Sequence, residues 1–307
     1  MAKASVYRKT ALHFQTAPLP GGTIPKRRGW GPVISSILQE GHDRLPELPE
    51  VETVLRSIRP HVVGRRILDA SFSSRRVMRE DAAAASSLLR GRSIRSIERR
   101  GKFLVFDMDG VALTIHLGMT GRLLWNGVPG PYTRARFWLV EGELLYDDVR
   151  QFGRIEVSER LPTRLARLGP EPLEIGVEEF TERLRSRRCR VKPLLLNQTF
   201  LRGLGNIYAD EALFRARIHP RAEAGRLSAA RARALHGAIQ GILRAAIASG
   251  GSSISDYVDG DGRKGWFQTE HCVYGRTGEP CVACGIAIRR IVLAQRGTHF
   301  CPHCQRR

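Results

Sequence analysis

The 307-residue chain has no run of about eighteen or more apolar residues, so the sequence predicts no membrane span. Its first segment lacks the apolar core that a signal peptide needs, and the cytoplasm is therefore the expected compartment. Acidic residues are scarce, because 30 Asp and Glu face 50 Lys and Arg and leave a net charge of +20. This excess favours a polyanionic partner over the alternative, a basic protein from a genome in which arginine is abundant.

Sustained periodicity is missing from residues 1–44, which mix proline, glycine and basic residues. We interpret this segment as a leader that is either disordered or not translated at all. The rest of the chain is expected to form a catalytic domain over residues 45–160, a helical domain over 161–257, and a loop with a zinc finger over 258–307.

The first domain is predicted to be a helix followed by short strands. The helix begins near Pro49, because apolar residues at helical spacing continue from there to Ile58. Strand-like runs bounded by glycine and aspartate then follow at 66–72, 93–108, 111–118, 134–140, 143–148 and 154–158. Strands at such close intervals indicate a sandwich or barrel of antiparallel strands.

The second domain is predicted to be helical. Its candidate helices cover residues 177–186, 191–198, 205–216 and 228–249. Ser228 is a suitable N-cap for the last of them, and the two glycines that follow it are a suitable stop. After Tyr257 only a loop and a short zinc-bound hairpin are expected. The predicted fold class is therefore α+β, with an antiparallel β-sandwich first and a helical domain second.

Four of the six cysteines form two Cys-x-x-Cys pairs, which are separated by residues 285–300. This spacing is typical of a four-cysteine zinc site, since two such pairs supply four soft ligands with little strain. No further ligand is needed, so the sequence predicts one structural zinc ion, and His303 is expected to lie outside its coordination. The predicted ligands are Cys281, Cys284, Cys301 and Cys304.

Residues 45–53 read Leu-Pro-Glu-Leu-Pro-Glu-Val-Glu-Thr. This segment resembles the amino terminus of the formamidopyrimidine-DNA glycosylases, in which methionine takes the place of the leucine and is removed. Further matches follow in the family's order: a lysine-bearing hairpin at 99–104, His-Leu-Gly-Met-Thr-Gly-Arg-Leu at 116–123, a helix–two-turns–helix signature at 203–211, and Gln-Arg-Gly-Thr at 295–298. Residues 148–153 resemble the family's Asp-Pro-Arg-Arg-Phe-Gly, with Gln151 replacing the second arginine.

The resemblance implies a bacterial base-excision repair enzyme that acts as a monomer on damaged duplex DNA. It would excise oxidised purines such as 8-oxoguanine and formamidopyrimidines, and then cleave the abasic site by β,δ-elimination. The nucleophile implied is Pro46, because a terminal proline is a secondary amine that can attack C1′ of the sugar and form a Schiff base. Glu47 is suited to deliver a proton to the sugar ring oxygen. Without the resemblance, both residues would be read as a loop that enters a helix.

The resemblance also implies the residues that hold the DNA. Lys102 and Arg296 are assigned to the active site with Asn206, where all three would bind phosphates around the extruded nucleotide. The other candidates for DNA contact are His116, Lys192 and Tyr274.

Flipping the damaged nucleotide out of the stack leaves a gap. By resemblance, Met119 and Phe152 would wedge into this gap and Arg150 would hydrogen-bond the orphaned cytosine. The alternative for the two apolar residues is ordinary core packing. Residues 255–268 resemble the family's lesion-recognition loop, and their glycine content suggests mobility that is lost on DNA.

Two other functions fit parts of the sequence. The sister family, endonuclease VIII, shares the proline chemistry but prefers oxidised pyrimidines, and Leu48 favours the purine-specific branch. A basic zinc-ribbon protein that binds DNA without catalysis would explain the charge and the cysteines equally well.

The proline mechanism requires a free amine, yet 45 residues precede Pro46. An internal proline nitrogen is a tertiary amide, which is neither basic nor nucleophilic. Three explanations are possible: either the leader is cleaved, or another residue such as Lys102 is the nucleophile, or translation starts at Leu45. We favour a start at Leu45, whose codon can initiate as methionine in bacteria. Loss of the leader removes seven basic and two acidic residues and changes the net charge from +20 to +15.

Overall fold

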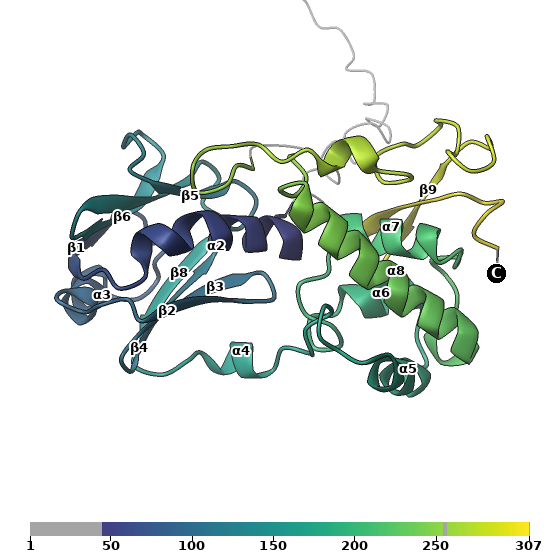
Figure 1. The fold of residues 1–307 in the computed structure, drawn as a ribbon, viewed down its shortest axis with the longest axis horizontal. Helices are drawn as coiled ribbons and strands as arrows, with labels where there is room; N and C mark the ends of the chain where they lie inside the picture. Colours follow the sequence, from purple (N-terminus) through teal and green to yellow (C-terminus); the bar gives the residue numbers. More distant parts are fainter. Residues whose placement is uncertain (1–44, 254–256, 307) are drawn as a thin grey trace, which may run out of the picture.

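The computed structural model describes residues 45–253 and 257–306, which form two lobes side by side (Figure 1). The leader, predicted for residues 1–44, lies outside the described residues, as do Ser255 and Asp256 of the predicted recognition loop. No helix in the described ranges is long and apolar enough to cross a membrane.

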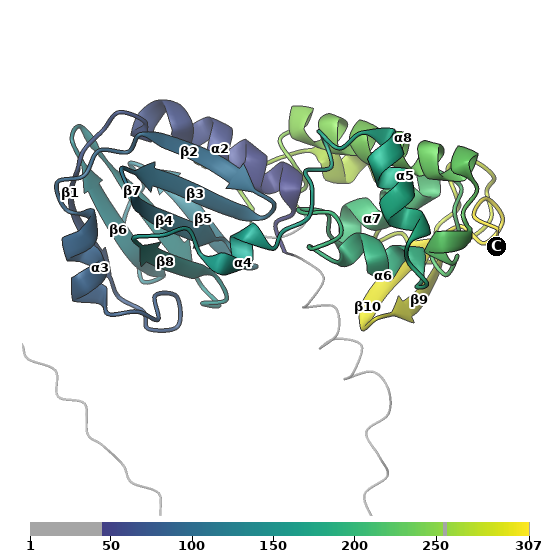
Figure 2. The ribbon, with the colours of Figure 1, turned by 90° about the horizontal axis from the view of Figure 1, so that it is seen from below.

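The first lobe is a β-sandwich of two antiparallel four-stranded sheets (Figure 2). One sheet has the order β1-β6-β7-β5, and the other has the order β2-β3-β4-β8. The strands are β1 (Ile67–Phe72), β2 (Ser96–Arg100), β3 (Phe103–Met108), β4 (Val111–His116), β5 (Gly121–Trp125), β6 (Thr133–Leu139), β7 (Gly142–Asp148) and β8 (Arg154–Ser158). Alternate residues of both sheets face one apolar core, which is the burial pattern that holds a sandwich together.

Helix α2 (Leu48–Val62) packs against this core through Val51, Val54 and Ile58, all of which are completely buried. Its first turn leaves the sandwich and reaches the second lobe, where Leu48 belongs to the other apolar core. Helix α3 (Ala82–Leu89) covers the end of β1, and its N-cap Asp81 accepts a hydrogen bond from the Ala84 amide. The short helix α4 (Thr163–Ala166) begins the connection to the second lobe.

The second lobe contains α5 (Val177–Arg185), α6 (Val191–Leu196), α7 (Asn206–Arg215) and α8 (Ala229–Ala248). Short 3-10 turns lie at Ala224–Arg226 and Phe267–Glu270. Ser228 caps α8 by accepting the Arg231 amide, as predicted. The chain ends in a two-stranded hairpin of β9 (Arg289–Leu293) and β10 (Arg296–Phe300), which packs on α7.

The described part of the predicted recognition loop returns to the first lobe, and it crosses the top of Figure 1. Gly260 donates its amide to Ser57 Oγ at 2.8 Å and accepts the Trp125 amide at 3.0 Å. A side chain at Gly260 would meet Ile58, since a Cβ there would lie 2.3 Å from Ile58 Cγ2. This segment therefore joins the two lobes a second time.

Candidate active site

Glu47 joins the start of α2 to the start of α7. Its Oε1 accepts the Ile207 amide at 2.9 Å, and its Oε2 accepts the Tyr208 amide at 3.4 Å. A helix N-terminus presents free amides and a partial positive charge, so it is a natural partner for a carboxylate. Gly205 permits this approach, because a Cβ there would lie 2.3 Å from Glu47 Cδ.

Glu47 is only 2% exposed. Its pKa is raised from 4.5 to about 7, because the effects of burial and of the nearby Glu50 outweigh the opposing effects of Lys102 and of the two amides of α7. A carboxyl group with a pKa near neutrality is half protonated under working conditions and can act as a general acid. Glu47 directly follows Pro46 in the sequence.

Lys102 is at the tip of the β2–β3 hairpin, where Gly101 takes a positive φ of 62° to make the turn. Burial lowers the pKa of Lys102, while Glu47 and Glu50 oppose the shift. His116 ends β4 next to this hairpin, and burial together with the Lys102 charge lowers its pKa to about 4. Its ring is therefore neutral near pH 7, with Nδ1 accepting the Gly118 amide at 3.1 Å.

These side chains meet at a cavity of about 270 Å³ between the lobes. Its lining comes from six separate stretches of the chain and comprises Leu45, Glu47, Lys102, His116, Leu196, Gln198, Leu204, Gly205, Asn206 and Arg296. Asn206 is 6% exposed, and neither polar atom of its side-chain amide has a partner within the described residues. An unpaired buried amide costs free energy, so its orientation fits a polar ligand such as a phosphate.

Pro46 is buried and does not itself line the cavity, but its neighbours in the chain, Leu45 and Glu47, both do. In the full-length chain its nitrogen is part of a peptide bond. The cavity thus unites Glu47, Lys102, His116, Asn206 and Arg296, all of which the sequence analysis selected.

Glu50 was not selected, although it organises the site. Its Oε2 accepts the Glu47 amide at 2.8 Å, and its Oε1 accepts the Tyr208 hydroxyl at 2.6 Å and the Ser252 amide at 2.7 Å. Glu47 and Glu50 together form a capping box, and the two glutamates three residues apart were the signal that could have revealed it. Through Ser252, the same carboxylate also holds the base of the recognition loop.

Lys192 does not line the cavity. It is completely buried, and its ammonium group lies 2.7 Å from Asp210 Oδ1 and donates to Gly297 O and Thr298 Oγ1, both at 2.9 Å. An ammonium group enclosed in this way does not face the cavity, in contrast to the DNA contact expected for Lys192. Tyr274 is also buried, and its amide donates to Glu211.

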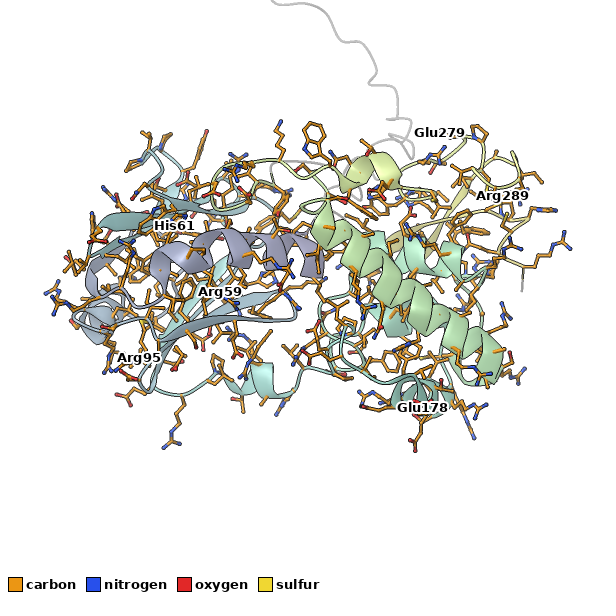
Figure 3. All side chains as sticks on the ribbon, viewed as in Figure 1. Arg59, His61, Arg95, Glu178, Glu279 and Arg289 are labelled. Carbon is orange, nitrogen blue, oxygen red and sulfur yellow. The ribbon has the colours of Figure 1, made fainter. Side chains whose placement is uncertain are left out.

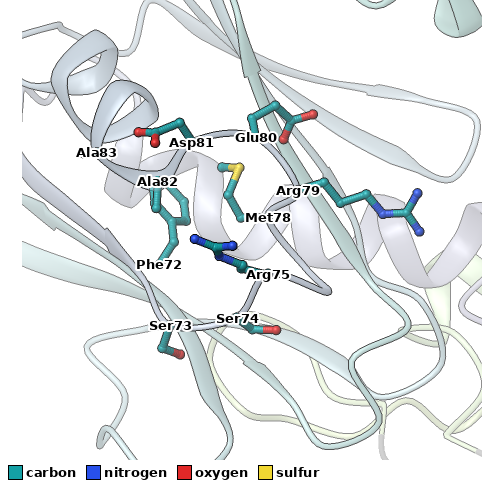
Figure 4. A pocket seen from close by; sticks show the side chains of 10 residues that line it. All are labelled: Phe72, Ser73, Ser74, Arg75, Met78, Arg79, Glu80, Asp81, Ala82 and Ala83. Carbon is teal, nitrogen blue, oxygen red and sulfur yellow. The ribbon is translucent and has the colours of Figure 1, made fainter.

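The three residues selected for filling the gap lie on two adjacent loops. Phe152 is 56% exposed, with the Arg150 guanidinium 4.7 Å from its ring centroid, whereas Met119 is 8% exposed. A second cavity, of about 530 Å³, lies beside α3 and is lined by residues 72–75 and 78–83 (Figure 4). None of the predicted site residues lines it.

The four predicted zinc ligands converge at the base of the β9–β10 hairpin. Their sulfur atoms lie within 4.8 Å of one another, and the Cys281–Cys304 and Cys284–Cys301 pairs are 3.9 and 3.5 Å apart. Four thiolates at a Zn–S distance of about 2.3 Å would be separated by about 3.8 Å, so this set fits one structural zinc ion. His303 is not part of the cluster, as predicted. Arg289 projects from this finger (Figure 3).

The fold and the site together define a zinc-finger DNA glycosylase with a helix–two-turns–helix domain. Three family models match the chain in order. They are the N-terminal domain of formamidopyrimidine-DNA glycosylase at residues 45–155, its H2TH domain at 168–258, and the zinc finger found in FPG and IleRS at 278–307.

Curated relatives agree with this assignment. A formamidopyrimidine-DNA glycosylase of Solibacter usitatus is 57% identical over 265 residues, which cover 86% of this chain and 100% of the relative. Another, from Symbiobacterium thermophilum, is 46% identical over 272 residues, 85% of this chain and 89% of the relative.

Solved structures agree as well. The MutM (FPG) protein of Thermus thermophilus superimposes with a TM-score of 0.77 at 45% identity and covers 85% of this chain and 98% of its own. Lactococcus lactis Fpg bound to DNA with an abasic site has a TM-score of 0.78 at 39% identity, over 85% of this chain and 100% of its own.

The chain belongs to the formamidopyrimidine-DNA glycosylase family. It is a base-excision repair enzyme of the bifunctional glycosylase and abasic-site lyase class, as the sequence predicted. The predicted α+β fold, with its β-sandwich, helix–two-turns–helix domain and zinc finger, is confirmed.

Proposed function

We propose that Pro46, once it carries a free amine, attacks C1′ of an oxidised purine nucleotide while Glu47 protonates the sugar ring oxygen. The C1′–O4′ bond opens as the ring oxygen takes the Glu47 proton, and the C1′–base bond breaks as the base leaves with the proton of the proline nitrogen. The nitrogen and C1′ are then joined as a cationic imine. The cationic imine makes the C2′ protons acidic, so that β- and then δ-elimination expel the two phosphates. The observation that carries this proposal is Glu47, a buried carboxyl group with a pKa of about 7 next to that proline.

The cavity supplies the binding groups for this reaction. Lys102 and Arg296 provide positive charge from opposite lobes, and Asn206 offers an amide without a partner among the described residues. The neutral His116 ring adds a further group that can contact the DNA backbone. These groups suit phosphates on both sides of an extruded nucleotide, and they would hold its register without reading sequence.

The remaining assignments follow the same proposal. Residues 45–160 form the catalytic domain, 161–257 the helix–two-turns–helix domain, and 258–307 the recognition loop and zinc finger. Met119, Arg150 and Phe152 fill the gap in the stack, while Tyr274 supports the site from within the fold. The protein acts as a monomer in the cytoplasm.

The start of the mature chain at Pro46 is part of the proposal. It is supported by the family model, which begins at residue 45, and by a relative whose whole length is matched by 86% of this chain. A translation start at Leu45, followed by removal of the initiator methionine, would free the proline nitrogen.

Glu47→Gln tests the division of roles. In a chain that begins at Pro46, this variant should excise 8-oxoguanine opposite cytosine about 10³-fold more slowly, because it cannot donate the proton. It should still cleave a pre-formed abasic site and be trapped on it by borohydride, since the amine is intact. Full excision activity in Glu47→Gln would remove the assigned role. Faster excision of thymine glycol than of 8-oxoguanine by the unmodified chain would favour the oxidised-pyrimidine alternative.

A further inference from the structure

A buried carboxylate joins the two loops that carry the gap-filling residues. Asp148 is completely buried at the end of β7. Its Oδ1 accepts the Thr120 hydroxyl at 2.5 Å, and its Oδ2 accepts the Gly153 amide at 2.8 Å. Thr120 follows Met119, and Gly153 follows Phe152, so one side chain fixes both loops at the residue beside an inserted one.

Thr120 contributes a second bond between the same loops. Its Oγ1 accepts the Arg150 amide at 3.1 Å while its hydroxyl proton is given to Asp148. A hydroxyl group can donate once and accept twice, so Thr120 uses both functions here. The backbone of Arg150 is thereby tied to the turn that carries Met119.

The backbones of the two loops are in direct contact. Gly118 has a φ of 67°, and a Cβ there would lie 2.4 Å from the Gly153 nitrogen. A Cβ on Gly153 would in turn collide with the Tyr146 hydroxyl, which itself donates to Leu117 O at 3.2 Å. Side chains at either glycine would push the loops apart, so the sequence keeps them together by composition as well as by hydrogen bonds.

The outer side of the 148–153 loop has its own anchor. Gln151 adopts a φ of 55°, and its Oε1 accepts the Ser74 hydroxyl at 2.7 Å. Ser74 lies on the wall of the cavity in Figure 4 and also accepts the Arg76 amide at 3.2 Å. An arginine at this position could only donate to Ser74, whereas the glutamine oxygen accepts the Ser74 hydroxyl proton.

We propose that Thr120 and Asp148 are positioning residues that hold Met119, Arg150 and Phe152 as one preformed wedge, with the Ser74–Gln151 bond as its outer anchor. This inference rests on the proposed function, in which those three residues enter the stack. The entropy of ordering two loops is then lost during folding and not when the damaged base is extruded. Two of the three side chains are in direct contact, since the Arg150 guanidinium lies over the Phe152 ring.

Thr120 and Asp148, with their bonds to the two loops, are called the clamp below. Thr120→Val tests the clamp, and Thr120→Ser is its matched control. Valine keeps the shape but loses the bonds to Asp148 and to the Arg150 amide, whereas serine keeps the hydroxyl. We expect Thr120→Val to excise 8-oxoguanine from duplex DNA at least about 10-fold more slowly in single turnover, the scale of one hydrogen bond to a charged group. Thr120→Ser should stay within about 2-fold of the unmodified chain.

A second substrate separates positioning from folding. Single-stranded DNA with a pre-formed abasic site has no gap to fill, so all three chains should cleave it at equal rates. The fluorescence of 2-aminopurine next to the lesion should rise more slowly with Thr120→Val, because it reports unstacking. Equal duplex excision by Thr120→Val and the unmodified chain would overturn the proposal, and so would an equal loss on both substrates.

Three further variants complete the test. If Thr120→Val does not fold, Ser74→Ala tests the outer anchor instead. Ser74→Ala should slow duplex excision and leave single-strand cleavage unchanged. An unchanged rate of duplex excision would overturn the proposed clamp. Phe152→Ala and Arg150→Ala test the proposed function itself. If they excise normally, the wedge role fails, whereas if they are slow and Thr120→Val is not, only the clamp fails.

Discussion

Lys102 is half-buried and Lys192 is completely buried, and the two lysines have different partners. Lys102 lines the cavity, where burial lowers its pKa and the nearby Glu47 and Glu50 oppose the shift. Lys192 is paired with Asp210 at 2.7 Å and donates to Gly297 and Thr298. The first lysine faces the cavity, whereas the second is paired inside the protein. The partners of the two lysines therefore distinguish them better than burial does.

The same hairpin contributes residues to the surroundings of both lysines. The β9–β10 hairpin supplies Arg296 to the cavity of Lys102, and Gly297 and Thr298 to the pocket of Lys192. The zinc ligands hold the base of that hairpin. Its residues thus link the two regions that the lysines represent.

Removal of zinc should have the largest effect on DNA binding, because it disrupts the hairpin that contributes to the surroundings of both Lys102 and Lys192. Cys281→Ser, or treatment with a chelator, should unfold the hairpin, since structural zinc contributes directly to folding. DNA binding should be lost while the β-sandwich stays folded, as a gel-shift assay and circular dichroism would measure. Elemental analysis that finds no zinc in active protein would contradict the assignment.

Substitution of each lysine sharpens the comparison. Lys192→Met should lower the free energy of unfolding by about 3 to 5 kcal/mol, because it leaves Asp210 buried without its cation. Lys102→Met should leave that free energy nearly unchanged and should slow excision, because it removes a charge from the cavity. Urea denaturation and single-turnover excision measure the two effects. A Lys192→Met chain with normal stability and slow excision would instead place Lys192 at the DNA, as the sequence first suggested.

A smaller effect is expected from pH. Burial raises the pKa of Glu47 to about 7, so the folded protein binds more protons than the unfolded chain between pH 4.5 and about 7. The contribution of this group to stability is therefore greatest at low pH and is lost as the pH rises through that window. Excision should likewise decline as the pH rises above 7, when the general acid is lost.

The difference in the free energy of unfolding between the unmodified chain and Glu47→Gln reports on this carboxyl group. The stability of Glu47→Gln relative to the unmodified chain should improve as the pH rises from 4.5 to about 7. A constant difference across that range, measured by denaturation at several pH values, would show that the carboxyl group has an ordinary pKa.

The helices were predictable because their periodicity is local. Helix α5 ends one residue before its predicted range, and α7 and α8 are one residue shorter than predicted at each end. Helix α6 stops two residues early, where Asn197 becomes extended. Helix α3 was missed, because its Ala-Ala-Ala-Ala-Ser-Ser core has no clear polar face. Strand β5 was also missed, since it overlaps the motif at 116–123, which we interpreted by its resemblance to the family and not by its secondary structure.

The cavity itself was foreseen only by resemblance. Glu47 and Arg296 are far apart in the sequence, and no local pattern brings them together. The position of Lys192 could not be foreseen, because its pairing with Asp210 depends on how α6, α7 and β10 pack. Glu50 and Asp148 escaped notice for a related reason: each binds several backbone amides or hydroxyls that only the fold assembles.

The free amine of Pro46 is the central claim, and borohydride trapping tests it most directly. Two purified proteins should be compared on DNA with 8-oxoguanine opposite cytosine, the full 307-residue chain and a chain that begins at Pro46, with the terminus of each verified by mass spectrometry. We expect a covalent protein–DNA adduct through Pro46 with the shorter chain, and no such adduct with the full chain. An equal yield of adduct from a full chain that still begins at Met1 would contradict the claim and would require another nucleophile.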